Sequence, residues 1–182
     1  MNTESNPTRA VSSHLSLSYK LFVVLGILVS IFIFDQFTKV WAVSELHGQG
    51  PTFYLNGLFQ FVYAENPGAF LGMGGDWSRP VRFVIFAVLV LCGLGGMLWY
   101  LLKKESSRLN LFAYSFILAG GFGNLWDRVA HEHGHVIDFM LIDLGGFLRT
   151  GVFNVADVAI VVGVLLAFFG DSVRARRSSR VK

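Results

Sequence analysis

The chain contains little charge and almost no cysteine. Only 15% of its 182 residues are charged and 53% are hydrophobic, with a mean hydropathy of +0.55. Soluble domains carry about 25% charge, so this deficit indicates that lipid is the solvent for much of the chain. The single cysteine, Cys92, excludes an intrachain disulfide.

The motifs of several enzyme classes are also missing. There is no G-x-S-x-G, no H-E-x-x-H and no Walker loop, and Ser115 has no His or Lys base in an evident position. His131, His133 and His135 occur without an acidic ligand at helical spacing, so we expect neither a metal nor another cofactor. The net charge of +3 could suggest nucleic acid. The basic residues flank apolar segments, however, so we expect no nucleic-acid partner and assign them to membrane orientation.

Four apolar segments are each long enough to cross a hydrocarbon core of about 30 Å as a helix. They cover about residues 21–43, 81–102, 111–129 and 152–169. The sequence therefore predicts an all-α integral membrane protein with four transmembrane helices. A cleavable signal peptide is the alternative for the first segment. No small-residue cleavage site follows Phe34, and three further segments come later.

Two loops are expected to carry a small extracytoplasmic β element. The first contains an aromatic run from Phe53 to Tyr63 with Asn56-Gly57 as a turn signal, which predicts a strand pair. In the second, Gly145-Gly146 separates two apolar runs, which is typical of a hairpin. We see no internal repeat of the kind found in many transporters.

Basic residues predict the orientation. Ten of the 15 lie before the first segment, between the second and third, or after the fourth, and the positive-inside rule then places both termini in the cytoplasm. We expect residues 1–20 to be a disordered cytoplasmic tail, residues 21–170 the transmembrane domain, and residues 171–182 a basic cytoplasmic tail.

Five ionisable residues interrupt the apolar segments, all near the ends that this topology places outside: Asp35, Lys39, Asp127, Arg128 and Asp157. A charged side chain in hydrocarbon costs at least a few kcal/mol, so such residues are candidates for a functional site. Asp35 and Lys39 are four apart and can pair on one helix face.

Amides accompany the charges at helical spacing. Asn124 precedes Asp127 by three residues and Arg128 by four, and Asn154 precedes Asp157 by three. Gly120, Gly121 and Gly123 come just before Asn124, and small residues let helices pack closely in lipid. We therefore expect the polar faces to meet in a crevice, covered by the loop that carries Asp138.

Two neighbouring carboxylates suit acid–base chemistry without a metal. They cannot both ionise easily, so one can act as a base toward water while the other donates a hydrogen bond to the carbonyl under attack. Spacing alone leaves open which two aspartates pair, and Asp143 competes with Asp138. Asn154 and Asp157 could instead simply cap the fourth helix.

Five ordered motifs over roughly residues 20–170 resemble the lipoprotein signal peptidases (signal peptidase II), a family of four-span bacterial aspartic proteases. They are Asp35-x-x-Thr38-Lys39, Asn66-Pro67-Gly68-Ala69-Phe70, Gly120-Gly121-Phe122-Gly123-Asn124-Leu125-Trp126-Asp127-Arg128, Val136-Ile137-Asp138-Phe139 and Phe153-Asn154-Val155-Ala156-Asp157.

The resemblance implies that Asp138 and Asp157 are the catalytic pair. Asn66 and Asn124 would then serve a peptide held in extended form, while Asn154 would orient Asp157 or the substrate backbone. Two departures from the family pattern occur. Only Ala69 separates the motif glycine from Phe70, where two residues are usual, and the stretch from Asp127 to Asp138 is slightly longer.

Supporting roles are expected for the remaining charged residues. Arg128 is a forked donor suited to pairing with Asp127 and to fixing loop geometry. Asp35 and Lys39 would tie the first loop to the first span. All four could also be purely structural neutralised pairs.

The resemblance also implies the reaction and its setting. The chain would be a membrane-embedded aspartic endopeptidase that removes signal peptides from diacylglyceryl-modified prolipoproteins, cutting on the amino side of the lipidated cysteine. We expect a monomer in the bacterial cytoplasmic (inner) membrane, surrounded by membrane lipids, with its site near the outer leaflet. One alternative is a small transporter that uses the aspartates as a relay, and another is a purely structural subunit.

Overall fold

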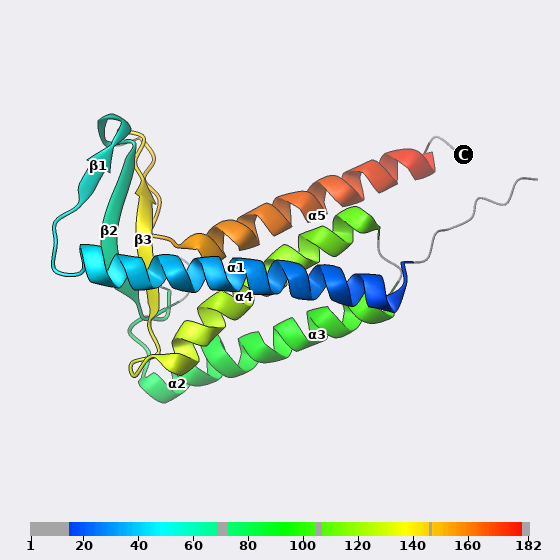
Figure 1. Cartoon of the computed structure of the whole chain (residues 1–182), viewed down its shortest axis with the longest axis horizontal. Helices are drawn as coiled ribbons and strands as arrows, with labels where there is room; N and C mark the ends of the chain where they lie inside the picture. Colours follow the sequence, from blue (N-terminus) through cyan, green and yellow to red (C-terminus); the bar gives the residue numbers. More distant parts are fainter. Residues whose placement is uncertain (1–14, 69–72, 105–106, 146, 180–182) are drawn as a thin grey trace, which may run out of the picture.

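Long helices run side by side, and a small sheet closes one end of the bundle (Figure 1). The computed structural model describes residues 15–68, 73–104, 107–145 and 147–179, with side chains described to residue 170. The helices are α1 (Leu17–Leu46), α4 (Arg108–Ala130), α5 (Val155–Ser179) and one segment made of α2 (Arg79–Phe83), the π-helical η3 (Val84–Leu89) and α3 (Val90–Lys103).

The observed helix ends differ from the expected ones because capping residues fix them. Ser16 accepts a hydrogen bond from the Tyr19 N–H at 3.2 Å, so α1 starts at Leu17 and residues 17–20 belong to the helix, not to the tail. Ser107 caps α4 in the same way. The last helix continues through residues 171–179, which were expected to be a tail. Residues 1–14 and 180–182 of the expected tails lie outside the described residues.

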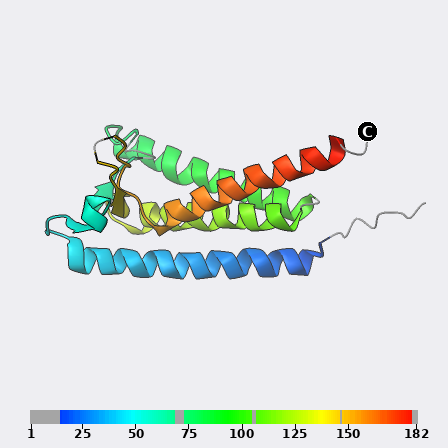
Figure 2. The same cartoon turned by 90° about the horizontal axis from the view of Figure 1, so that it is seen from above.

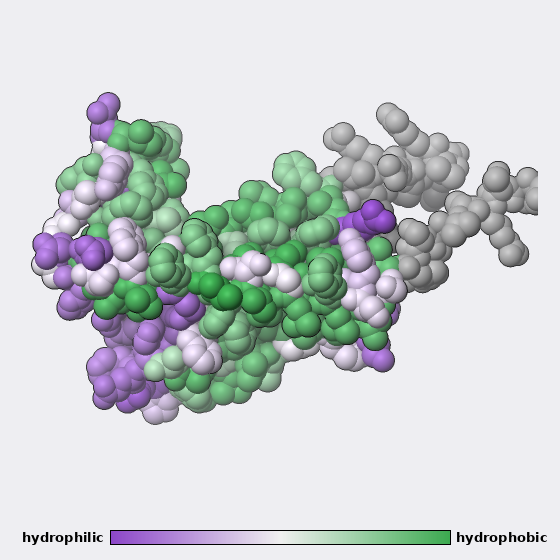
Figure 3. Space-filling view, viewed as in Figure 1, coloured by the Kyte–Doolittle hydropathy of each residue, from purple (hydrophilic) through white to green (hydrophobic). Residues whose placement is uncertain are grey.

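Much of the helical surface is hydrophobic (Figure 3). Two described helical segments, Leu17–Leu46 and Arg79–Lys103, are long and apolar enough to cross a membrane by length and composition. The apolar part of the last helix, Val155–Gly170, is shorter. The helix α4 packs against α1, α3 and α5 and buries polar residues such as Ser115 and Asp127. The four-span expectation is therefore met by this test for two segments.

The helices α4 and α5 approach each other closely where glycine removes the side chain. A Cβ atom on Gly120 would collide with the carbonyl oxygen of Ala156, and one on Gly163 would lie 2.6 Å from the carbonyl oxygen of Ala113. This close approach brings the end of α4 beside the start of α5. The figure seen from above shows α1 along one side of the bundle (Figure 2).

The sheet has the antiparallel order β1-β2-β3, formed by β1 (Thr52–Tyr54), β2 (Phe59–Asn66) and β3 (Val136–Ile142). The predicted strand pair at residues 53–63 is confirmed as β1 and β2. Leu55, Asn56 and Gly57 form the turn between them, all with positive φ. The sequence did not indicate that β3 would join this sheet.

The predicted hairpin after β3 also forms. Asp143 and Arg149 pair in an isolated antiparallel bridge, and Gly145 adopts φ +70°. The N–H of Thr150 donates to the carbonyl of Ile142 at 2.9 Å. Gly146 of this hairpin, and Ala69 and Phe70 of the shortened motif, lie outside the described residues.

Candidate active site

Asp138 and Asp157 meet where the sheet contacts the helices. Asp138 lies on β3, and Asp157 lies in the first turn of α5. The side-chain Nδ2 of Asn154 donates to Oδ1 of Asp138 at 2.6 Å, and the main-chain N–H of Asn154 donates to Oδ2 of Asp157 at 3.1 Å. Both aspartates line a cavity of about 240 Å³. One asparagine therefore contacts both carboxyl groups of the expected pair.

The same asparagine caps α5. Oδ1 of Asn154 accepts from the main-chain N–H of Asp157 at 3.0 Å, and Asp157 returns a bond by accepting from the N–H of Asn154. This reciprocal pattern satisfies N–H groups that a helix start leaves without a partner. The capping role is thus present in the structure, and it fixes the position of Asp157 relative to Asn154.

Two further asparagines hold the carboxyl groups from outside. Asn66 Nδ2 donates to Oδ2 of Asp138 at 3.1 Å, and Asn124 Nδ2 donates to Oδ1 of Asp157 at 2.8 Å. Asn154 Nδ2 also donates to Oδ1 of Asn124 at 3.0 Å. Each aspartate therefore accepts from two N–H groups, and the side chains of Asn66 and Asn124 contact the acids themselves.

A buried cation, Lys39, contacts the asparagine that binds Asp157. Lys39 Nζ lies 2.7 Å from Oδ2 of Asp35 and 2.8 Å from Oδ2 of Asp127, and the side chains of all three are at most 2% exposed. It also donates to Oδ1 of Asn124 at 3.3 Å. The predicted pairing of Asp35 with Lys39 is confirmed, and Lys39 links it to the asparagine that holds Asp157.

Asp35 and Asp127 also bind main-chain groups of the site. Oδ1 of Asp35 accepts from the N–H of Ala156 at 2.9 Å, and Oδ2 of Asp127 accepts from the N–H of Ile137 at 3.3 Å. The expectation that Asp35 and Lys39 tie the first loop to the first span is therefore wrong. They tie α1 to α4 and α5, because their side chains point into the bundle.

Arg128 does not form the predicted ion pair with Asp127 among the described residues. Its guanidinium donates to the carbonyl of Asn124 at 2.9 Å and to the carbonyl of Gly68 at 2.7 Å. Consecutive residues of a helix do not face each other, so Asp127 turns to Lys39 while Arg128 turns to the loop. The bond to Gly68 joins Arg128 to the loop that it was expected to fix, and that role stays a prediction.

The surroundings of Asp138 favour its neutral form. Burial raises the pKa of this carboxyl to about 7, and the charge of Asp157 acts in the same direction. Hydrogen bonds from Asn66 and Asn154 and the charge of Lys39 oppose the rise. A carboxyl with this pKa holds its proton near neutrality, as the acid partner of a carboxyl pair must.

Sequence reasoning missed Gln36. Its Nε2 donates to Oδ1 of Asp127 at 2.9 Å and to Oδ2 of Asp35 at 3.2 Å, so it bridges the two carboxylates that hold Lys39. Its only sequence signal was a polar residue beside Asp35 in an apolar segment. Among the described residues, no group of three His, Cys, Asp or Glu side chains is placed to hold a metal ion.

These features define a class: a helical protein with two carboxyl groups that line one cavity, the arrangement of an aspartic peptidase. A family model described as Signal peptidase (SPase) II matches residues 27–171. The chain belongs to the signal peptidase II family, and it is an aspartic endopeptidase of that type.

Curated relatives agree. The chain is 35% identical to the lipoprotein signal peptidase of Clostridium novyi (strain NT), with 82% of this chain and 94% of the relative covered. It is 39% identical to that of Psychromonas ingrahamii, with 81% and 83% covered. A third, from Paraburkholderia phytofirmans, is 37% identical, with 86% and 87% covered.

Two solved structures, each of a bacterial membrane enzyme studied by the in meso method, are similar in fold. One, at 2.3 Å resolution, matches with a TM-score of 0.70 at 24% identity, covering 87% of this chain and 91% of the other. The second, at 1.9 Å resolution, has a TM-score of 0.68 at 25% identity, covering 80% and 90%.

Proposed function

We propose that Asp138 and Asp157 are the catalytic pair with which this signal peptidase II removes signal peptides from prolipoproteins. The observation that carries the proposal is Asn154, which hydrogen-bonds both carboxyl groups at the wall of one cavity. The proposed substrate is a diacylglyceryl-modified precursor, cut on the amino side of its lipidated cysteine.

In this mechanism the two acids have different tasks. Asp138 keeps its proton near neutral pH and donates it to the carbonyl oxygen of the scissile bond. Asp157, already an acceptor for two N–H groups, takes a proton from water as the water oxygen bonds to the carbonyl carbon. The tetrahedral species then collapses: its carbon–nitrogen bond breaks, and the leaving nitrogen receives the proton held by Asp157. As the carbonyl forms again, one hydroxyl of the same carbon returns its proton to Asp138, so both acids regain their starting states.

The supporting residues fix the geometry. Asn66 donates a hydrogen bond to Asp138, and Asn124 donates one to Asp157. Lys39 donates to Asn124 and neutralises the charges of Asp35 and Asp127. Arg128 holds the loop at Gly68. Preorganisation of this kind lowers the cost of reaching the transition state, because the groups need not reorient during the reaction.

The proposed setting is the bacterial cytoplasmic membrane, crossed four times by a monomer with both termini in the cytoplasm. Three arguments support it. The start of α1 and the end of α5 lie at the end of the bundle opposite the sheet (Figure 1). Exposed hydrophobic side chains cover the helices. The helix α4 packs against α1, α3 and α5, so its polar residues can be buried away from lipid.

Conservative substitutions test the catalytic pair. Asp138→Asn and Asp157→Asn should each lower the cleavage rate of a lipidated precursor by about 10²- to 10⁴-fold or more while the protein stays folded. The matched control is Asp143→Asn, which changes a carboxylate five residues after Asp138, outside the cavity. Full activity in either of the first two variants would overturn the proposal.

Labelling tests the topology. In a Cys92→Ser background, a cysteine placed at Thr52 in β1 should react with a membrane-impermeant thiol reagent applied from outside. A cysteine placed at Lys103, at the end of α3, should react only after the membrane is opened. The reverse pattern would invert the proposed orientation.

A further inference from the structure

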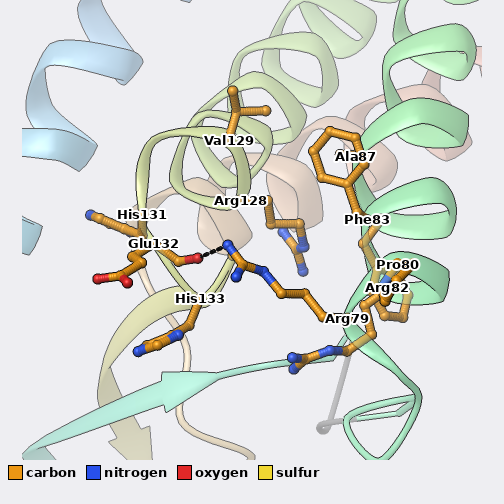
Figure 4. Close-up of a pocket in the computed structure, with 12 residues that line it drawn as sticks. Arg79, Pro80, Arg82, Phe83, Ala87, Arg128, Val129, His131, Glu132 and His133 are labelled. Atoms are coloured by element: carbon orange, nitrogen blue, oxygen red, sulfur yellow. Dashed lines mark hydrogen bonds between the residues drawn. The ribbon is translucent and has the colours of Figure 1, made fainter.

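A second cavity, of about 320 Å³, lies beside the candidate active site. It is formed between the start of the helical segment Arg79–Lys103 and the end of α4 (Figure 4). Phe86 and Arg128 line both this cavity and the one that contains the two aspartates. The two cavities are therefore neighbours that share a wall.

The second cavity is strongly basic. Three arginines line it, Arg79, Arg82 and Arg128, against one carboxylate, that of Glu132. Arg79 is already oriented by a hydrogen bond to the main-chain carbonyl of Glu132 (Figure 4). Asp138 and Asp157 belong to the neighbouring cavity, where they face Arg128.

Two of these arginines keep a donor without a partner. Nε of Arg82 and Nε of Arg128 are both buried, and neither has a hydrogen-bond partner within the part of the chain that the structure describes. Each guanidinium group also donates to the loop after Asn66: Nη1 of Arg82 donates to the carbonyl of Pro67 at 3.3 Å, and Nη2 of Arg128 donates to that of Gly68. Nη1 of Arg128 donates to the carbonyl of Asn124. Buried donors are nearly always paired, so these two leave the guanidinium groups with unused hydrogen-bonding capacity. Together with the excess of arginines over carboxylates in the cavity lining, this favours an anionic ligand.

The remaining wall of the cavity is apolar. Phe83 and Val129 line it and are also exposed on the outer surface of the bundle, at 51% and 61%. In the close-up, Val129 lies at the opposite end of the cavity from Arg79 and His133 (Figure 4). A ligand with an anionic head and an apolar tail matches this division.

We propose that Arg79, Arg82 and Arg128 form a binding site for a phosphate group, supplied by the headgroup of a phospholipid in the outer leaflet. Guanidinium groups bind phosphate oxygens through paired N–H donors, and Phe83 and Val129 would border the first part of an acyl chain. The lipid as the source of the phosphate rests on the membrane placement proposed above.

The site would act on the enzyme through the loop that follows Asn66. Arg82 and Arg128 hold Pro67 and Gly68, while Asn66 holds Asp138. A phosphate bound to both guanidinium groups would fix this loop and so stabilise the position of Asp138. The bound lipid would thereby couple the surrounding leaflet to the geometry of the catalytic pair.

Lipid retention tests the proposal without relying on cleavage. The full-length protein in detergent micelles is titrated with phosphatidylglycerol, and bound lipid is counted by native mass spectrometry. The double variant Arg79→Gln, Arg82→Gln should bind phosphatidylglycerol at least about tenfold more weakly, since charge-assisted hydrogen bonds are lost. The control is Arg149→Gln, which removes a positive charge from a residue outside the cavity and should bind like the wild type.

A single variant and two other ligands distinguish the possible outcomes. Arg79→Gln alone changes an exposed side chain and should show a smaller loss in the same direction, even if the double variant folds poorly. A diacylglycerol with the same acyl chains should bind weakly, and equally to wild type and variants. Inorganic phosphate that binds as tightly as the lipid would confirm the oxyanion site and assign its source to soluble phosphate. Equal retention of phosphatidylglycerol by wild type and both arginine variants would overturn the proposal.

Lipid binding and cleavage can be measured separately in one variant. Asp138→Asn should retain phosphatidylglycerol like the wild type while losing cleavage. Lipid binding that survives in an inactive variant supports the site whether or not the assignment of the catalytic pair holds.

Discussion

Asn154 donates from its side chain to Asp138 at 2.6 Å, which joins the N-cap of α5 to strand β3. The two residues come from a helix start and a strand, and this bond is buried. Because Asn154 also caps the helix that carries Asp157, one side chain sets the relative position of both proposed catalytic acids. Its removal should therefore affect stability and catalysis by separable routes.

Asn154→Ala should lower the cleavage rate at least about tenfold and the free energy of unfolding by about 1–2 kcal/mol, because both the cap and the bond to Asp138 are lost. Cleavage assays and thermal unfolding in micelles measure the two effects. Asn154→Ser is the matched variant: serine is a good cap but too short to reach Asp138. Relative to Asn154→Ala, Asn154→Ser should regain most of the free energy of unfolding and little of the cleavage rate. An equal gain in both would contradict the double role of Asn154.

The pH dependence should follow Asp138. Its pKa is raised to about 7, so its neutral form persists up to that pH and the carboxyl ionises above it. The cleavage rate should therefore fall as pH increases beyond about 7, with a midpoint that belongs to the coupled pair of acids. Rates measured between pH 5 and 9 check this, and a rate that stays constant to pH 9 would rule out Asp138 as the acid.

The free energy of unfolding should also depend on pH through the raised pKa of Asp138. Between pH about 4 and 7 the folded state keeps a proton on Asp138 that the unfolded chain has lost, since the ordinary pKa is 3.8. The free energy of unfolding should then fall as pH rises through this window. Asp138→Asn should lack this part of the slope. Thermal unfolding of both proteins at several pH values makes the comparison, and identical slopes would contradict the raised pKa.

Lys39→Ala should be strongly destabilising. It would leave Asp35 and Asp127 as buried carboxylates without their cation, which costs about 3–5 kcal/mol. Lys103→Ala, an exposed site at the end of α3, is the control and should change stability by no more than about 0.5 kcal/mol. The triple variant Lys39→Met, Asp35→Asn, Asp127→Asn should be more stable than Lys39→Ala, because its two amide side chains carry no charge. If Lys39→Ala unfolds like Lys103→Ala, the buried ion pairs do not contribute as described.

Gly120→Ala should disturb the start of α5. The new methyl group would meet the carbonyl of Ala156, the residue before Asp157, so we expect a loss of about 1–3 kcal/mol and slower cleavage. Gly93→Ala on α3 is the control, because a Cβ there meets no described atom within 4 Å. It should be neutral or stabilising by up to about 1 kcal/mol. Equal effects of the two substitutions would contradict the close packing of α4 on α5.

Local relationships could be predicted from the sequence with good accuracy. The pairing of Asp35 with Lys39 and the reciprocal cap of Asn154 with Asp157 depend only on helical spacing, and both are present. The aromatic run with its Asn-Gly turn likewise produced the expected strand pair. The failure at Arg128 was also local, since adjacent helical residues point in different directions.

The contact of Asn66 with Asp138 illustrates what spacing could not reveal. The two residues are 72 positions apart, and they meet because β2 pairs with β3 in a register that sets Ala64 opposite Asp138. Asn66 is then a diagonal neighbour on the same face of the sheet. Only the motif resemblance had singled out Asp138 over Asp143.

The sequence by itself determined the apolar segments, the turn of the first strand pair, the cap at Asn154 and the polar pairs three or four residues apart, because helix and strand periodicity fix such neighbours. The tertiary structure decided which distant groups meet: Asp138 with Asp157 through Asn154, Lys39 with Asp127, and the arginines with the loop after Asn66. These contacts depend on strand register and on how closely α4 and α5 pack, which are set by the packing of the whole chain and not by any one segment.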